Sequence, residues 1–201
     1  MRKEFAGFDK EDIKLISSLN TPKKIQDFIN TLEINFEKQG ETCYSPKTVL
    51  KKRKAHCMEG AMLASCILRF HRFKPLILDI EATKKDFDHV VALFKVNNCW
   101  GSISKTNHSV LRYREPIFKS VRELALSFFH EYFTDEGEKT MRSYSSPVNL
   151  SQFDKKNWMT SNSDVWFIPD YLTTIPHKKI LTRSQISSLR KADKIEIEAG
   201  K

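Results

Sequence analysis

The pattern of apolar positions changes its period in the middle of the chain. Between residues 57 and 72, small and apolar side chains recur every three or four residues, on a stripe of Cys57, Gly60, Ala61, Ala64 and Leu68. This spacing predicts a helix, and the apolar residues on its other sides predict burial. Three candidate β-strands follow at 75–82, 88–96 and 99–105. The second is apolar on both faces from Val90 to Phe94, as expected of a central strand.

The flanking segments carry weaker patterns. Residues 9–38 are predicted to be helical, with Thr21 as an N-cap and Pro22 at a first helical position. A loop and a short helical turn are expected over 40–54, and a further helix over 120–133. The apolar run 164–172 fits a strand or a packed loop, and the tail from Thr182 alternates in charge.

These elements predict one α+β domain spanning residues 1–201, with an irregular C-terminal decoration from about residue 134. A buried helix is expected to pack on an antiparallel sheet. The chain has no internal repeat and no linker-like segment that would divide it.

A predicted hairpin places chemically useful side chains together. Asn97-Asn98 fits a two-residue turn, because asparagine tolerates the left-handed conformation. Val96 would then face Cys99, Val91 would face Ser104, and His89 would face Thr106. Paired residues share a sheet face, so Ser104 becomes the diagonal neighbour of His89. Cys57 at a helix start, His89 on a strand and Ser104 beside it are the kinds of residue that form a nucleophile, a base and an orienting group.

The segments HCMEGAMLASCILRFH and DHVVALFKVNNCWGSIS resemble the core of the transglutaminase-like superfamily, within the papain-like group of cysteine enzymes. The resemblance covers about residues 44–105. It implies that Cys57 is the nucleophile at the start of a buried helix, that His89 is the catalytic histidine, and that Trp100 lies on the second hairpin strand. The segments after Asn107 suggest a small bacterial branch of this superfamily.

The chain departs from the family pattern at one position. The family aspartate would fall four residues after Trp100, where this chain has Ser104. A serine hydroxyl can accept a hydrogen bond from an imidazole and fix its tautomer, but it cannot stabilise an imidazolium by charge. Thr106, Asn107, Asp86 and Asp88 are other candidates for that role.

Two functional hypotheses follow. In the first, the chain is a cysteine enzyme that transfers or hydrolyses the acyl group of an amide in a peptide, a protein or a glutamine-type substrate. Cys57, His89 and Ser104 are its catalytic residues, and no metal or cofactor is required. In the second, the fold is catalytically idle and binds a protein or a polyanion; Ser104 and the net charge of +9 favour this alternative. Nucleic-acid binding rests on charge alone.

Composition indicates the general class of protein. Hydrophobic residues make up 40% of the chain, enough for a sizeable core, and no apolar run approaches the roughly 18 residues needed to span a bilayer. With no secretory signal in evidence, we expect a cytoplasmic protein whose four cysteines stay reduced, with no membrane partner. The cysteines lack C-x-x-C spacing, which argues against the common zinc sites.

Single residues also have simpler interpretations. Cys57 fits either a buried small hydrophobe or a reactive thiolate at a helix N-terminus. His56 fits either a source of positive potential or a satisfied helix cap. The basic run 51–54 fits a solvated turn, a cationic approach for an acidic substrate, or a field that lowers the pKa of the thiol.

Overall fold

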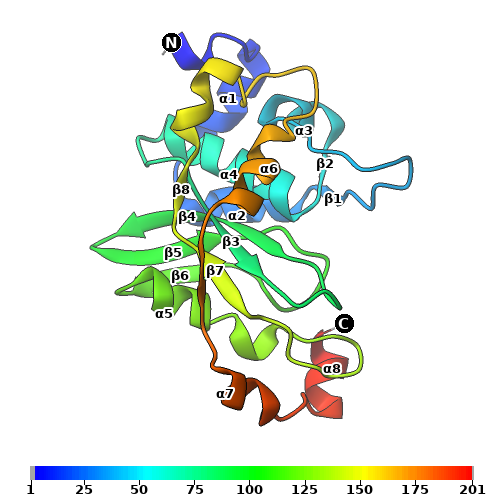
Figure 1. The fold of residues 1–201 in the computed structure, drawn as a ribbon. Helices are drawn as coiled ribbons and strands as arrows, with labels where there is room; N and C mark the ends of the chain where they lie inside the picture. Colours follow the sequence, from blue (N-terminus) through cyan, green and yellow to red (C-terminus); the bar gives the residue numbers. More distant parts are fainter. Residues whose placement is uncertain (1–2, 201) are drawn as a thin grey trace.

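The computed structural model describes residues 3–200 (Figure 1). One antiparallel sheet of seven strands separates two groups of helices, and its order is β6-β5-β4-β3-β7-β9, with β8 also paired to β3. The strands are β3 (Leu76–Glu81), β4 (His89–Val96), β5 (Cys99–Ile103), β6 (Arg114–Phe118), β7 (Ser143–Ser145), β8 (Val148–Asn149) and β9 (His177–Lys179). A separate parallel pair joins β1 (Glu33–Ile34) to β2 (Lys54–Ala55).

Helices cover both faces of the large sheet. One group consists of α1 (Lys10–Ser18), α2 (Pro22–Asn30), α3 (Pro46–Lys52), α4 (Cys57–Phe70) and α6 (Phe167–Thr174), and it lies on the side shown uppermost in Figure 1. On the other side lie α5 (Val121–Leu126), α7 (Arg183–Ser187) and α8 (Lys194–Gly200). Short 3₁₀ helices occupy Lys3–Phe5, Phe129–Glu131 and Leu150–Lys156.

Two apolar clusters follow from this layering. The first packs α4 against the sheet residues Ile77, Val90, Ala92, Phe94 and Ile103. The second packs α5 and the chain after it against the opposite face, at Leu78, Ile80, Val91 and Leu93. Side chains therefore alternate between the clusters along β4, as the pleat requires. The predicted α+β class, with a buried helix on an antiparallel sheet, is confirmed.

The central hairpin has the predicted turn and register. Asn97 and Asn98 adopt φ of 50° and 62°, and Val96 pairs with Cys99. The pairing ends at Ala92 with Ile103, however, so the predicted opposition of His89 and Thr106 does not form. Beyond Ile103 the backbone of Ser104 bonds to a side chain of α2 and leaves the ladder.

Some predicted elements were wrong in type or extent. The segment 9–38 is two helices that end at Asn30, followed by β1. The run 164–172 overlaps a helix, α6, because Ile168 and Leu172 are both buried at a spacing of four. The C-terminal part after residue 134 is more than an irregular decoration, since it supplies β7, β8 and β9 to the sheet.

The predicted helix over 120–133 stops at Leu126. The guanidinium of Arg114 donates to the carbonyl and to the hydroxyl of Ser127, and it takes a carbonyl that a continuing helix would use. Phe128 and Tyr132 are nevertheless buried in the second cluster. The predicted extent of this helix was therefore wrong.

Candidate active site

Cys57 is the first residue of α4, and His56 is its N-cap. The carboxylate of Glu59 accepts a hydrogen bond from the His56 backbone N–H at 3.0 Å, as in a capping box. The thiol of Cys57 is half-buried and lies 3.9 Å from the carbonyl oxygen of Asp88, the residue before β4. The start of the helix thus meets the start of the strand that carries His89.

His89 is held by Ser104. Its Nε2 lies 2.8 Å from the Ser104 hydroxyl, and that hydroxyl donates to the carbonyl of Leu111 at 2.6 Å. A hydroxyl has one proton, so Ser104 must accept from Nε2–H, and Nδ1 is left for the thiol. A carboxylate at position 104 could not donate to Leu111, which gives a structural reason for serine here.

Two imidazoles, not one, act on the thiol. Burial raises the pKa of Cys57, but hydrogen bonds to the side chains of His56 and His89 outweigh it and lower the pKa to about 5. Burial lowers the pKa of His56, but its hydrogen bond to Cys57 and the charge of Glu59 raise that pKa to about 9. The sequence analysis left His56 open between a source of positive potential and a helix cap, and the structure places it as the N-cap with its ring on the thiol.

The basic run 51–54 does not supply this effect. Lys51 and Lys52 are exposed on the last turn of α3, and Arg53 lies over the ring of Phe28, 4.7 Å from its centroid. The main contributions that lower the pKa of Cys57 come from the two histidines. We therefore interpret the run as a solvated turn.

A second layer fixes Ser104. The amide of Gln26 on α2 donates to the Ser104 carbonyl at 2.8 Å and accepts from its N–H at 2.9 Å. Leu111, whose carbonyl receives the Ser104 proton, has a left-handed φ of 58°, and its N–H donates to Glu131 at 2.9 Å. An unfavourable backbone conformation is thus held in place from both sides.

Replacing Gln26 with alanine is expected to lower the free energy of unfolding by about 1–3 kcal/mol, because it leaves two buried backbone groups without partners. Chemical denaturation measures the loss. Lys23→Ala, on an exposed position of the same helix, is the control and should change stability little. Equal stability of the two variants would contradict the role of Gln26 as a clamp.

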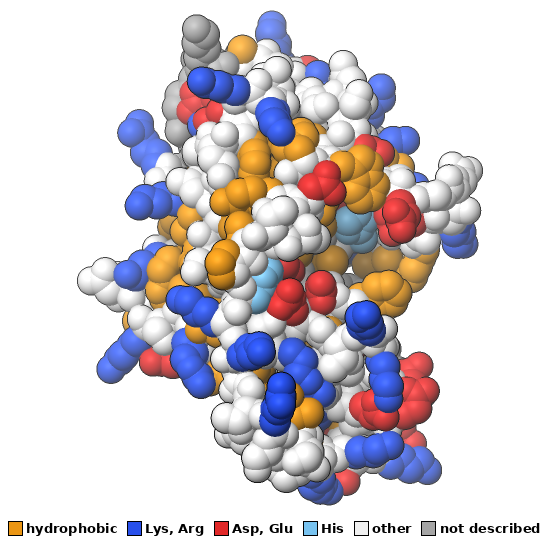
Figure 2. Space-filling model, viewed as in Figure 1, with side chains coloured by type: hydrophobic (Ala, Val, Ile, Leu, Met, Phe, Trp, Pro, Cys, Tyr) orange, Lys and Arg blue, Asp and Glu red, His pale blue; other side chains and the backbone are white. Residues whose placement is uncertain are grey.

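The thiol opens into a cleft of about 760 Å³. The charged residues that line the cleft are mainly acidic: Glu37, Asp86, Asp88, Glu131 and Asp135. Lys105 also lines the cleft, but it is buried and its ammonium group donates to the carbonyl of Leu32. Phe36 and Phe87, which are 64% and 89% exposed, also line the cleft. In Figure 2, acidic and histidine side chains gather near the middle of the face shown, while lysine and arginine are dispersed. This lining does not favour the acidic substrate suggested by the basic run.

Two of the other candidates bond to groups other than His89. The Asp88 carboxylate accepts from Ala82 N–H at 2.8 Å, and that of Asp86 accepts from the Thr140 hydroxyl, so neither replaces the family aspartate. Trp100 is half-buried against the second cluster. Cys43 and Cys66 are buried, which raises the pKa of each thiol.

Known families identify the class of this fold. Residues 10–103 match the model of a family described as a transglutaminase-like domain, and they include Cys57 and His89. This part of the chain is a transglutaminase-like domain, as the resemblance of its core motifs implied. No curated protein matches the chain.

Two further features of the described residues concern membranes and metal ions. No helix within residues 3–200 has the length and apolar character needed to cross a bilayer. In the same range, no group of three or more histidine, cysteine, aspartate or glutamate side chains has an arrangement suited to a metal ion.

Proposed function

We propose that the protein is a cysteine enzyme that transfers or hydrolyses the acyl group of an amide. The observation that carries the proposal is a helix-start thiol that contacts two imidazoles and opens into a cleft. A thiolate is the nucleophilic form of cysteine, and a lowered pKa makes it abundant at neutral pH.

The reaction begins with the thiol proton on His89. The Cys57 thiolate attacks the carbonyl carbon, and the carbonyl π-electrons move onto oxygen. The intermediate then collapses, the C–N bond breaks, and imidazolium His89 gives its proton to the leaving amine. Neutral His89 next takes a proton from water or an incoming amine, which attacks the thioester and releases Cys57 as thiolate.

The start of α4 suits the developing oxyanion. The first N–H groups of a helix have no intrahelical acceptor, and Cys57 is the first residue of α4. Its backbone N–H is the donor that we assign to the carbonyl oxygen of the substrate. The N-terminal end of the helix dipole adds to this stabilisation.

The acidic lining of the cleft limits the charge of the substrates that it can accept. Like charges repel across a cleft of low dielectric, so an anionic group beside the scissile bond is disfavoured. A neutral or cationic amide fits the lining, with Phe36 and Phe87 available to contact an apolar neighbour.

Iodoacetamide at pH 6 is expected to alkylate Cys57 before Cys43, Cys66 and Cys99, because pH 6 lies above the pKa of about 5 for Cys57. Peptide mapping by mass spectrometry after short exposures gives the four rates. Burial raises the pKa of Cys43 and Cys66, so these thiols should lag. Cys57→Ala is the control and should remove the fast phase. If Cys57 reacts no faster than the others, an idle fold that binds a partner becomes the better hypothesis.

A further inference from the structure

Glu59 is a fully buried side chain whose hydrogen-bonding partners show its charge. Its carboxylate accepts from the Thr42 hydroxyl and the Tyr44 N–H at 2.9 Å, from the His56 N–H at 3.0 Å, and from the Asn35 amide at 3.1 Å. Every one of these groups donates. Three of the four can only donate, and such a set of donors stabilises the ionised carboxylate.

A buried carboxylate requires a compensating charge. The His56 ring supplies it, with Nε2 at 3.5 Å from Glu59 Oε1 and at 3.9 Å from Glu37 Oε1. Within residues 3–200, no lysine or arginine nitrogen lies within 4.0 Å of the Glu59 carboxylate. The other titratable groups around the His56 ring are the Cys57 thiol and, across that thiol, His89.

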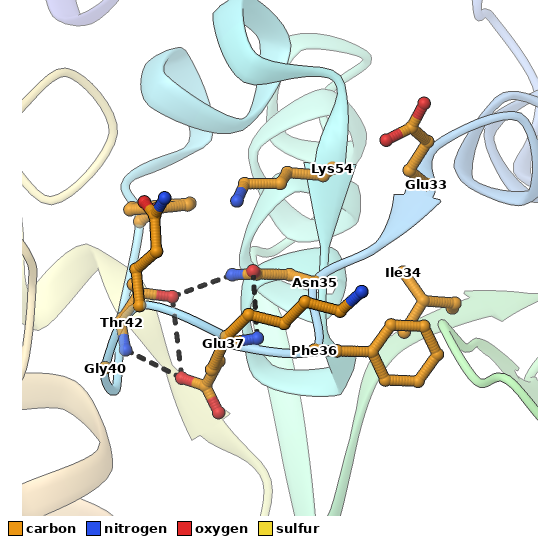
Figure 3. Close-up of a pocket in the computed structure, with 11 residues that line it drawn as sticks. Glu33, Ile34, Asn35, Phe36, Glu37, Gly40, Thr42 and Lys54 are labelled. Atoms are coloured by element: carbon orange, nitrogen blue, oxygen red, sulfur yellow. Dashed lines mark hydrogen bonds between the residues drawn. The ribbon is translucent and has the colours of Figure 1, made fainter.

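The Thr42 carbonyl orients the His56 ring. It accepts from Nε2 at 3.0 Å, which assigns a proton to that nitrogen and leaves Nδ1 for the thiol. The loop that carries Thr42 is itself cross-linked, as Figure 3 shows: Asn35 donates to the Thr42 hydroxyl at 2.7 Å, and the Thr42 N–H donates to Glu37 at 2.7 Å. The His56 imidazole is therefore held by a loop that has its own internal hydrogen bonds.

We propose that His56, paired with buried Glu59, is a permanent imidazolium that keeps the sulfur of Cys57 as a thiolate. It would be a positioning and charge-supplying residue beside the nucleophile, separate from the acid–base residue His89. The carboxylate that is missing beside His89 is thus present beside the other imidazole. This inference rests on the proposed function, because it divides the work of one site between two histidines.

The division has a consequence for the reaction. After His89 has given its proton to the leaving amine, it is neutral, and it regains a charge only as it takes a proton from the attacking water or amine. Deacylation must still expel Cys57 as thiolate when the C–S bond breaks. A second cation, whose proton is not consumed in the cycle, stabilises that leaving group.

The test is the pH profile of Cys57 alkylation by iodoacetamide in wild type, His56→Asn and His89→Ala. Asparagine is a favourable N-cap and can donate to the Thr42 carbonyl, so the fold should be retained. The midpoint is expected near 5 in wild type. We expect His56→Asn to raise it by at least one unit, which slows alkylation at pH 5 about fivefold, and we expect His89→Ala to raise it less.

A second readout is taken on the wild-type protein and needs the variant only to assign one signal. In NMR spectra of the wild-type protein, the Cε1–H signal of His56, assigned by its absence in His56→Asn, should show the protonated form at pH 7. It should titrate only towards pH 9. A His56 signal that titrates near pH 6.5, or an unchanged alkylation midpoint in His56→Asn, would overturn the inference. Failure of the proposed function would show differently, as wild-type protein that turns over no amide.

Discussion

Replacing His89 with alanine is expected to slow amide cleavage by a factor on the order of 10³, the usual contribution of a positioned acid–base residue. The Cys57 thiolate should persist in this variant, because His56 still faces it. The leaving amine, however, would have no proton donor. Cys57→Ala is expected to abolish cleavage altogether, since no thioester can form.

The measurement is the release of aminomethylcoumarin from a library of peptidyl amides, compared at pH 7 on the best substrate. His108→Ala is the matched control, because His108 is an exposed histidine that lines the same cleft. It should retain most of the wild-type rate. Cleavage by His89→Ala at the rate of the control would contradict the assigned role of His89.

Truncating Phe128 to alanine is expected to lower the free energy of unfolding by about 3–5 kcal/mol, the largest loss of stability that we predict. Phe128 has no exposed surface, and its ring lies 6.5 Å from that of His89, centroid to centroid. The guanidinium of Arg114 lies over the same ring, 4.1 Å from its centroid. The cavity would therefore remove support from the catalytic imidazole as well as from the second apolar cluster.

Phe87→Ala is the matched control for this change. Phe87 is 89% exposed at the cleft, so its removal should change stability by less than about 0.5 kcal/mol. It should instead weaken binding of substrates with an apolar side chain. Denaturant unfolding of both variants measures the contrast, and a similar loss in each would show that Phe128 is not packed as described.

Much of the site was predictable because local patterns specify it. The stripe from Cys57 to Leu68 predicted the helix that carries the nucleophile, and Asn97-Asn98 predicted the register of the hairpin. Ser104 was predicted near His89 by that register, and the two side chains do bond, although the strand pairing itself ends at Ile103. These inferences rest on contacts within one helix or between adjacent strands, where periodicity determines which residues meet.

Other elements of the fold could not be predicted from the local sequence pattern. The apolar run 164–172 is compatible with either a strand or a helix. Only the burial of Ile168 and Leu172, four residues apart, identifies it as a helix. Of the three short strands after residue 134, β7 and β8 pair with the free edge of β3, and β9 pairs with β7. Short strands of two or three residues are set by their partners, not by their own composition.

The sequence by itself determined the α+β class, the helix-start position of Cys57 and the spacing that brings Ser104 to His89. Tertiary structure alone decided that α4 covers one face of the sheet while His89 packs against Phe128 on the other, so that thiol and imidazole meet around the start of β4. It also decided that Glu59 is buried among four donors and makes His56 its counterion. The physical reason is that burial and desolvation, which set these charges, depend on elements distant in sequence that close over the site.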